Sequence, residues 1–97
     1  MKTLPMEITV TVRNRQGLHA RPAAQFVRIT GQYENCEVTV CRDGGMAVNG
    51  KSIMGMMMLG AGPGTDLKIV VEGEGQEDLC EEIRSLIDAG FGEELAD

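Results

Sequence analysis

The chain has 97 residues and carries nine basic against fifteen acidic side chains, which gives a formal net charge of −6. This length supports one modest core, and we expect a single domain over residues 1–97 with its core at about 6–92. The acidic balance argues against nucleic acid as a partner, because phosphate binding needs a basic surface. No apolar run approaches the length of a membrane span, so we expect no insertion into a membrane.

The three cysteines, Cys36, Cys41 and Cys80, are odd in number and lack the spacing of a zinc site. We interpret them as reduced thiols and expect neither a metal nor a cofactor. The first five residues also lack the apolar core of a signal peptide. Together these features predict a cytoplasmic location.

The first third of the chain predicts a strand followed by a helix. Residues 6–12 alternate between apolar and polar side chains, which is typical of a strand with one buried face. After a turn at 14–17, apolar residues recur at helical spacing over 23–30, and Gly31 ends that helix.

A hairpin and a short helix are predicted next. Residues 36–41 alternate again, and the turn residues 42–45 precede a short strand at 46–49. Ser52 is a good N-cap, because its hydroxyl can accept a hydrogen bond from the first helical turn. It predicts a helix that runs to about Leu59.

The remaining residues predict one more strand and one more helix. Residues 67–71 alternate as a strand, and 79–87 carry the apolar stripe of a helix that ends near Gly90. The order βαββαβα predicts an α+β fold, an open-faced two-layer β-sandwich with a four-stranded, mostly antiparallel sheet and three helices on one face. The other sheet face is expected to carry Thr9, Thr11, Glu37 and Thr39.

The single histidine, His19, stands where the first turn gives way to the helix. Amide groups at a helix N-terminus lack intrahelical partners and the helix dipole is positive there, so an anion beside His19 would be stabilised. Arg21 adds a permanent positive charge, and Pro22 suits a first helical turn because its missing N–H is not needed. The stretch 17–24 therefore indicates a phosphate site built around a nucleophile.

Phosphorylation of an imidazole needs a nitrogen that is neutral at about pH 7 and donors for the phosphoryl oxygens. We expect His19 to supply the nucleophile, with Arg21 as its catalytic partner, and Ala20 and Arg21 to bind phosphate at the helix N-terminus. A competing interpretation makes His19 a surface residue or a helix cap.

The segment 52–59 is apolar around nearly the whole circumference of its short helix. A two-layer domain cannot bury every side of such a helix, so some of its side chains are expected to stay exposed for several partners, drawn from Ile53, Met54, Met57 and Met58. Met56 and Leu59 are expected in the core. The competing interpretation is that the methionines only fill an irregular core.

Residues 45–52 match the nucleotide-binding pattern G-x-x-x-x-G-K-[ST]. That pattern binds phosphate where a strand feeds directly into a glycine-lined loop, whereas 46–48 is predicted as a strand between a turn and a helix. The chain is also too short for the usual parallel sheet. A nucleotide-binding module that uses Gly45–Ser52 stays as a competing hypothesis, and it predicts ATP affinity that Lys51→Ala removes.

Two motifs, Gly17–Ala24 and Lys51–Gly55, resemble HPr, the histidine-containing phosphocarrier of the bacterial phosphoenolpyruvate-dependent phosphotransferase system. The resemblance to this HPr/NPr family covers about residues 6–92. It implies that His19 is phosphorylated at Nδ1, that Arg21 steadies the phosphoryl group and that Ser52 is a regulatory phosphorylation site. It also implies the open-faced β-sandwich.

The resemblance implies a carrier with a phosphohistidine intermediate rather than a stand-alone enzyme. Phosphorylated Enzyme I would pass its phosphoryl group to His19, and a histidine of a IIA domain of a sugar permease or of a regulatory target would accept it. HPr kinase/phosphorylase is the partner implied for Ser52. The implied docking residues are Ile53, Met54 and Met57, and because the whole chain is acidic we expect basic residues to cluster around His19, namely Arg21, Arg28 and Lys51.

Two further hypotheses stay open at this point. One assigns the protein to sugar uptake and the other assigns it a mainly regulatory use, in a nitrogen-linked or kinase-controlled branch, and the sequence is compatible with both. A third, a purely structural or interaction domain in which His19 is a helix cap, predicts no phosphotransfer at all.

Overall fold

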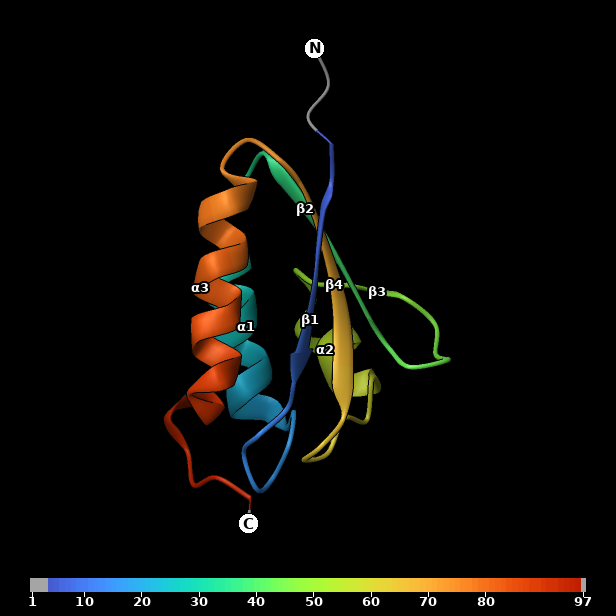
Figure 1. Cartoon of the computed structure of the whole chain (residues 1–97), viewed down its shortest axis with the longest axis vertical. Helices are drawn as coiled ribbons and strands as arrows, with labels where there is room; N and C mark the ends of the chain where they lie inside the picture. Colours follow the sequence, from blue (N-terminus) through green and yellow to red (C-terminus); the bar gives the residue numbers. More distant parts are fainter. Residues whose placement is uncertain (1–3, 97) are drawn as a thin grey trace.

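The computed structural model describes residues 4–96. Residues 1–3 and 97 lie outside the described residues, and with them the ends of the predicted domain and part of the segment expected to lack a signal-peptide core. The elements, shown in Figure 1, are β1 (Met6–Thr11), α1 (Ala20–Gly31), β2 (Cys36–Arg42), β3 (Val48–Asn49), α2 (Ile53–Met58), β4 (Asp66–Gly73), α3 (Gln76–Asp88) and a single 3-10 turn, η1 (Gly90–Gly92).

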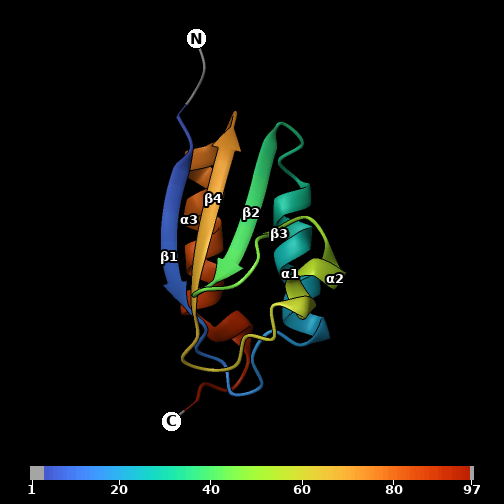
Figure 2. The ribbon, with the colours of Figure 1, turned by 90° about the vertical axis from the view of Figure 1, so that its right-hand side faces the viewer.

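The four strands form one sheet in the order β1-β4-β2-β3, and every neighbouring pair is antiparallel. The helices lie on one face of this sheet, and its other face is open (Figure 2). The alternation of side chains sets these two faces, because successive residues of a strand point to opposite sides. The predicted α+β open-faced sandwich is confirmed, and the residues expected on its open face are all exposed: Thr9, Thr11, Glu37 and Thr39.

The core lies between the sheet and the helices, where the apolar stripe of each helix meets the inner sheet face. Its largest fully buried apolar side chains come from β2, β4 and all three helices, together with the segment after β1: Val12, Phe26, Val40, Met56, Leu67, Ile69, Val71, Leu79, Ile83 and Ile87. Leu59 is also buried, so the expectation for Met56 and Leu59 is confirmed.

The second strand of the hairpin is shorter than predicted. Only Val48 and Asn49 pair with β2, while Met46 and Ala47 are exposed in the loop before them. At the other end the chain leaves the ladder at Gly50, whose amide donates to the Val38 carbonyl at 2.8 Å. The segment 45–52 is thus a loop, a two-residue strand and a helix cap, which is not the strand-loop-helix of a nucleotide-binding loop.

Helix α2 is short but anchored at both ends. The Ser52 hydroxyl accepts a hydrogen bond from the Gly55 amide at 2.9 Å, so the predicted N-cap is confirmed. At the C-terminal end, Arg42 Nη1 donates to the carbonyls of Leu59 and Gly60 at 3.0 and 2.9 Å. Helix α2 packs against α1 and lies next to β3 at the sheet edge. Within residues 4–96, no helix has both the length and the apolar character needed to cross a bilayer.

Candidate functional site: the His19 pole

The backbone before α1 places His19 at the N-terminus of that helix. Gly17 has φ of +70°, and a Cβ at this position would stand 2.4 Å from the Ala61 carbonyl oxygen, so only glycine fits. The Leu18 amide donates to that same carbonyl at 2.9 Å. His19 then occupies the N-cap position with an extended backbone, φ −81° and ψ −170°.

The imidazole of His19 does not cap the helix, because its side chain makes no cap hydrogen bond. Its Nε2 instead lies 3.0 and 3.1 Å from the two carboxylate oxygens of Glu93. The side chain is 37% exposed, so a partner protein can reach it. Within residues 4–96, Nδ1 has no hydrogen-bond partner. The interpretation of His19 as a plain helix cap is therefore wrong.

After α3 the chain turns back, and this turn brings the Glu93 carboxylate within hydrogen-bond distance of the His19 imidazole. Gly90, Phe91 and Gly92 all have positive φ, 64°, 59° and 75°, and a Cβ on Gly90 would stand 2.3 Å from Leu95 Cδ2. The tail then pairs with the segment after β1, where the amide of Arg15 donates to the Glu94 carbonyl and the amide of Ala96 to the Arg13 carbonyl, both at 2.8 Å. This backbone pairing positions the Glu93 carboxylate.

A buried asparagine joins the two segments. Asn14 is fully buried, and its Nδ2 donates to the Gly17 carbonyl at 2.7 Å and to Glu93 Oε1 at 3.1 Å. The hydrogen bonds from His19 and Asn14 lower the pKa of the Glu93 carboxyl below its ordinary value, against a smaller opposing effect of burial. The Glu93 carboxylate is thus ionised near neutral pH and can only accept hydrogen bonds.

The ionised carboxylate selects one tautomer of the imidazole. A carboxylate that only accepts needs the proton on Nε2, so the neutral His19 ring has its lone pair on Nδ1. The free nitrogen is therefore the nucleophilic one. Sequence reasoning missed Glu93, because nothing in the local pattern of the tail points to a histidine 74 positions earlier.

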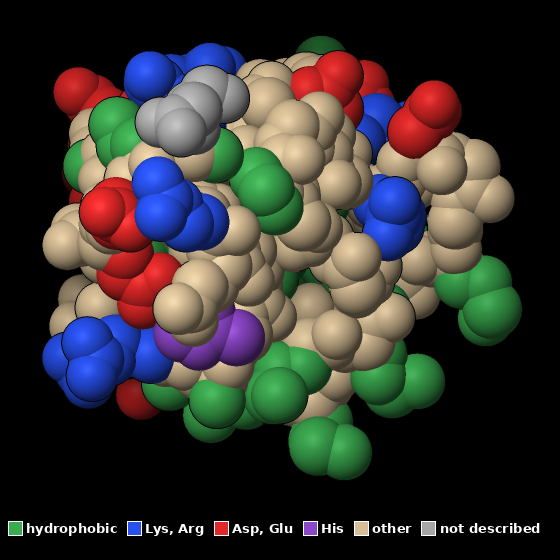
Figure 3. Space-filling model, turned by 90° about the horizontal axis from the view of Figure 1, so that it is seen from below, with side chains coloured by type: hydrophobic (Ala, Val, Ile, Leu, Met, Phe, Trp, Pro, Cys, Tyr) green, Lys and Arg blue, Asp and Glu red, His purple; other side chains and the backbone are tan. Residues whose placement is uncertain are grey.

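The amides at the start of α1 lie next to the imidazole. Those of Ala20 and Arg21 have no intrahelical acceptor, since they belong to the first turn. Both residues are exposed and, with His19 and Glu93, line a shallow hollow on this pole. In Figure 3 the histidine lies between charged side chains on one side and a group of hydrophobic side chains on the other.

Helix α2 packs against α1 and carries most of the exposed large hydrophobic side chains found over residues 4–96. The expectation that part of this helix stays exposed is confirmed, with exposures of 43% for Ile53, 70% for Met54, 41% for Met57 and 77% for Met58. We call Ile53, Met54 and Met57 the α2 patch.

The basic residues do not all gather at His19. Arg21 lies on the first turn of α1, and Arg28 is exposed seven residues later, about 10 Å along the same helix face. Lys51 does not join them, because its ammonium donates to the Tyr33 carbonyl at 2.8 Å, just beyond the opposite end of α1. The expected cluster around His19 is thus wrong for Lys51, whose charge instead stabilises the negative end of that helix.

No group of three or more histidine, cysteine or acidic side chains able to hold a metal ion is found over residues 4–96. Cys36 and Cys80 are buried as free thiols, and burial is the main cause that raises the pKa of each. Cys41 is partly exposed on the open sheet face. None of the three lines the His19 hollow.

Comparison with known proteins places this arrangement in a family. The PTS-HPr family, described as the PTS HPr component phosphorylation site, matches residues 6–89. The phosphocarrier protein HPr of Pseudomonas aeruginosa is 44% identical over 86 residues, which covers 89% of this chain and 94% of that protein. The corresponding protein of Treponema pallidum is 42% identical over 86 residues, with 89% and 96% coverage.

Solved structures agree with the sequence relatives. The crystal structure of HPr-C-His from Thermoanaerobacter tengcongensis superposes with a TM-score of 0.85 at 41% identity, covering 93% of this chain and 99% of that one. HPr from Bacillus anthracis gives 0.80 at 34% identity, with 88% and 99% coverage. The fold and the site together are those of a small carrier protein that presents a histidine at a helix N-terminus. The chain belongs to the HPr family of phosphocarrier proteins of the phosphotransferase system.

The same unit also occurs inside a larger protein. The multiphosphoryl transfer protein of Salmonella typhimurium is 42% identical over 84 residues, which covers 84% of this chain and only 22% of that protein. The match is therefore to one part of a longer chain, and the family implies partner proteins of the phosphotransferase system.

Proposed function

We propose that this protein accepts a phosphoryl group from phosphorylated Enzyme I on Nδ1 of His19 and passes it to a histidine of a IIA domain or a regulatory target, in the cytoplasm. The observation that carries the proposal is the Nε2 hydrogen bond to Glu93, since it leaves Nδ1 as the nitrogen with the lone pair. The membership in a phosphocarrier family supports the same assignment.

The transfer needs no general base. The Nδ1 lone pair attacks phosphorus, the bond between phosphorus and the donor histidine breaks, and the electron pair of that bond returns to the donor imidazole. The positive charge on the phosphorylated ring is balanced by the Glu93 carboxylate at 3.0 Å. The phosphoryl oxygens face the positive end of α1 and the Arg21 guanidinium, which stabilise their charge. Passage to the acceptor is the same step in reverse.

Docking is assigned to the α2 patch together with Arg28. Apolar side chains exposed beside a reactive group suit brief contacts with several partners, and the flexible thioethers of Met54 and Met57 adapt to different surfaces. Because one patch serves donor and acceptor, the two contacts exclude each other and transfer is sequential. Lys51 belongs to this surface only at its far edge, since its ammonium is bound to the Tyr33 carbonyl.

Regulation is assigned to Ser52. A phosphate on its hydroxyl would sit at the N-terminus of α2, where negative charge is tolerated, and would add close to two negative charges beside the α2 patch. We expect Ser52→Asp to fold normally and to slow transfer from Enzyme I, whereas Ser52→Asn keeps a capping side chain without the charge. Equal rates in these two variants would contradict the regulatory assignment.

The carrier function is tested by incubating the protein with phosphoenolpyruvate, Mg²⁺ and catalytic amounts of the cognate Enzyme I. Mass spectrometry should detect one acid-labile phosphate on wild type and none on His19→Ala, because a phosphoryl group on imidazole nitrogen hydrolyses in acid. Circular dichroism of the variant controls for folding. Label on folded His19→Ala, or no label on wild type with an Enzyme I that is active on another carrier, would contradict the proposal.

A further inference from the structure

The α2 region is unusually rich in accessible methionine. Four methionines among residues 4–96 are strongly exposed, at 86% for Met46, 70% for Met54, 41% for Met57 and 77% for Met58. In contrast, Met56 on the same helix is fully buried. Leucine or isoleucine would also make an apolar contact, but of these three side chains only the thioether of methionine can be oxidised reversibly.

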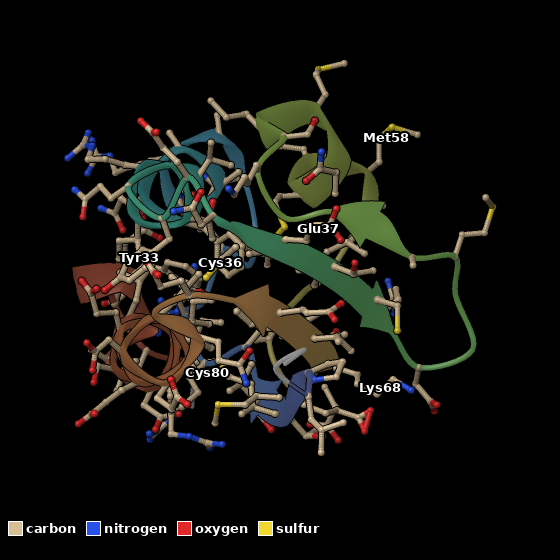
Figure 4. All side chains as sticks on the ribbon, turned by 90° about the horizontal axis from the view of Figure 1, so that it is seen from above. Tyr33, Cys36, Glu37, Met58, Lys68 and Cys80 are labelled. Carbon is tan, nitrogen blue, oxygen red and sulfur yellow. The ribbon has the colours of Figure 1, made fainter. Side chains whose placement is uncertain are left out.

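The exposed thioethers fall into two pairs with different neighbours. Met54 and Met57 stand three positions apart on α2 and belong to the α2 patch, the surface to which docking is assigned above. Met46 and Met58 instead line a hollow beside the β2–β3 loop, with Val48 and Arg42 on its wall. Figure 4 shows Met58 on the side of α2 that faces β3, away from α1. Met57 is turned about 100° around the helix from Met58.

We propose that Met54 and Met57 are sites of reversible oxidation by hydrogen peroxide, and that their sulfoxides block the docking on which transfer to His19 depends. This inference rests on the proposed carrier function. Each sulfur lone pair attacks one peroxide oxygen, an S–O bond forms and the O–O bond breaks. The methionine sulfur loses two electrons and keeps one peroxide oxygen, while the other oxygen leaves with both protons as water.

The consequence for docking follows from polarity. A sulfoxide oxygen is a strong hydrogen-bond acceptor. A partner that covers the α2 patch would bury this oxygen without offering it a hydrogen-bond donor, and this burial costs binding free energy. Residue volume and helix position hardly change, and Met56 stays protected in the core, so the fold survives. The switch therefore acts on the surface and leaves the imidazole and Glu93 intact.

The experiment measures the initial rate of phosphoryl transfer from Enzyme I before and after peroxide treatment of the carrier alone. Peroxide is then removed with catalase, and dithiothreitol reverses thiol oxidation but not the sulfoxides. Wild type is compared with two double variants that each lack two exposed methionines, Met54→Leu/Met57→Leu and Met46→Leu/Met58→Leu. Each rate is divided by that of the same protein without treatment, and peptide mass spectrometry locates the added oxygens.

We expect treatment to slow transfer about tenfold in wild type and in Met46→Leu/Met58→Leu, and less than twofold in Met54→Leu/Met57→Leu. Methionine sulfoxide reductases of both stereospecificities should restore the rate, and Met56 should stay unmodified. Equal slowing in both double variants would overturn the proposal, as would sulfoxides at Met54 and Met57 without any slowing. Absence of transfer in untreated wild type is a separate result, which overturns the carrier function itself.

Discussion

At the scale of single residues, the site depends on the pairing of His19 with Glu93. In the proposed transfer the imidazole carries the chemistry, but an isolated neutral histidine distributes its proton between both nitrogens. The Glu93 carboxylate, 3.0 Å from Nε2, fixes the proton on that nitrogen. The Asn14 side-chain amide donates to the same carboxylate at 3.1 Å and so fixes its position. In the proposed transfer, Glu93 is thus a positioning residue, which acts through the ring and does not itself receive the phosphoryl group.

We expect Glu93→Gln to slow transfer from Enzyme I about tenfold, since an amide can face Nε2 with either its oxygen or its NH₂ group. Nitrogen NMR of the imidazole should show the fraction of Nε2–H tautomer falling. Glu94→Gln is the matched control, because the Glu94 carboxylate pairs with Arg15 at 3.0 Å rather than with His19. An unchanged tautomer fraction in Glu93→Gln would contradict this role.

The same carboxylate makes stability depend on pH. Folding lowers the pKa of Glu93, so its contribution to the free energy of unfolding is complete above the ordinary carboxyl pKa and is lost as the pH falls through the lowered value. Denaturant unfolding at about pH 7 and about pH 3 should therefore show a smaller acid-induced loss in Glu93→Gln than in wild type. The opposite order would mean that Glu93 does not ionise more easily in the folded protein.

At the scale of elements, α1 and α3 are joined at the end far from His19. The Tyr33 hydroxyl, just after α1, donates to the Glu82 carboxylate on α3, and Lys51 binds the Tyr33 carbonyl. Figure 4 shows Tyr33 between these helices. One pole of the molecule thus holds the helices together, while the other presents the imidazole.

The hydrogen bond to Glu82, followed by burial and by the charge of Glu82 itself, raises the pKa of Tyr33 to about 12. Tyr33 is the chain's one tyrosine, so the phenolate absorbance reports on it alone. We expect Glu82→Gln to move the titration midpoint down toward the ordinary value of about 10. Glu81→Gln, an exposed carboxylate on the same helix, should leave it in place. The contact's contribution to stability is present below the ordinary pKa and is lost as the pH rises through about 12.

At the scale of the whole molecule, charge is distributed unevenly. The net charge is −6, yet the site face of α1 carries Arg21 and Arg28, while α3 exposes five acidic side chains over its length: Glu77, Asp78, Glu81, Glu82 and Asp88. We call Arg21 and Arg28 the basic strip, and we expect it to orient an acidic partner toward His19 during encounter.

We expect Arg28→Glu to slow transfer from Enzyme I about fivefold at low ionic strength, and less as salt is added. Arg84→Glu changes the net charge equally, but it lies exposed on α3 and should have little effect. The initial rates of phosphoryl transfer to the two variants and to wild type are compared by quenched assays over a series of salt concentrations. If both variants slow transfer alike, net charge rather than the strip governs docking.

Local patterns in the sequence were enough to predict the two motifs and the order of the strands and α-helices, although β3 is shorter than predicted. Period-two and helical patterns are local, and so is the Ser52 cap, so each could be recognised without knowing what the segment packs against. The exposure of Met54 and Met57 also followed from the sequence, because two layers cannot cover every side of an apolar helix.

The contacts around those elements became known only from the folded chain. Glu93 reaches His19 because three consecutive residues with positive φ turn the chain after α3. The following residues, 94–96, then pair with residues 13–15. Lys51 lies away from the imidazole because α2 begins beside the C-terminal end of α1. Such contacts join positions far apart in the chain, and no local pattern encodes them, since they depend on where whole elements come to rest.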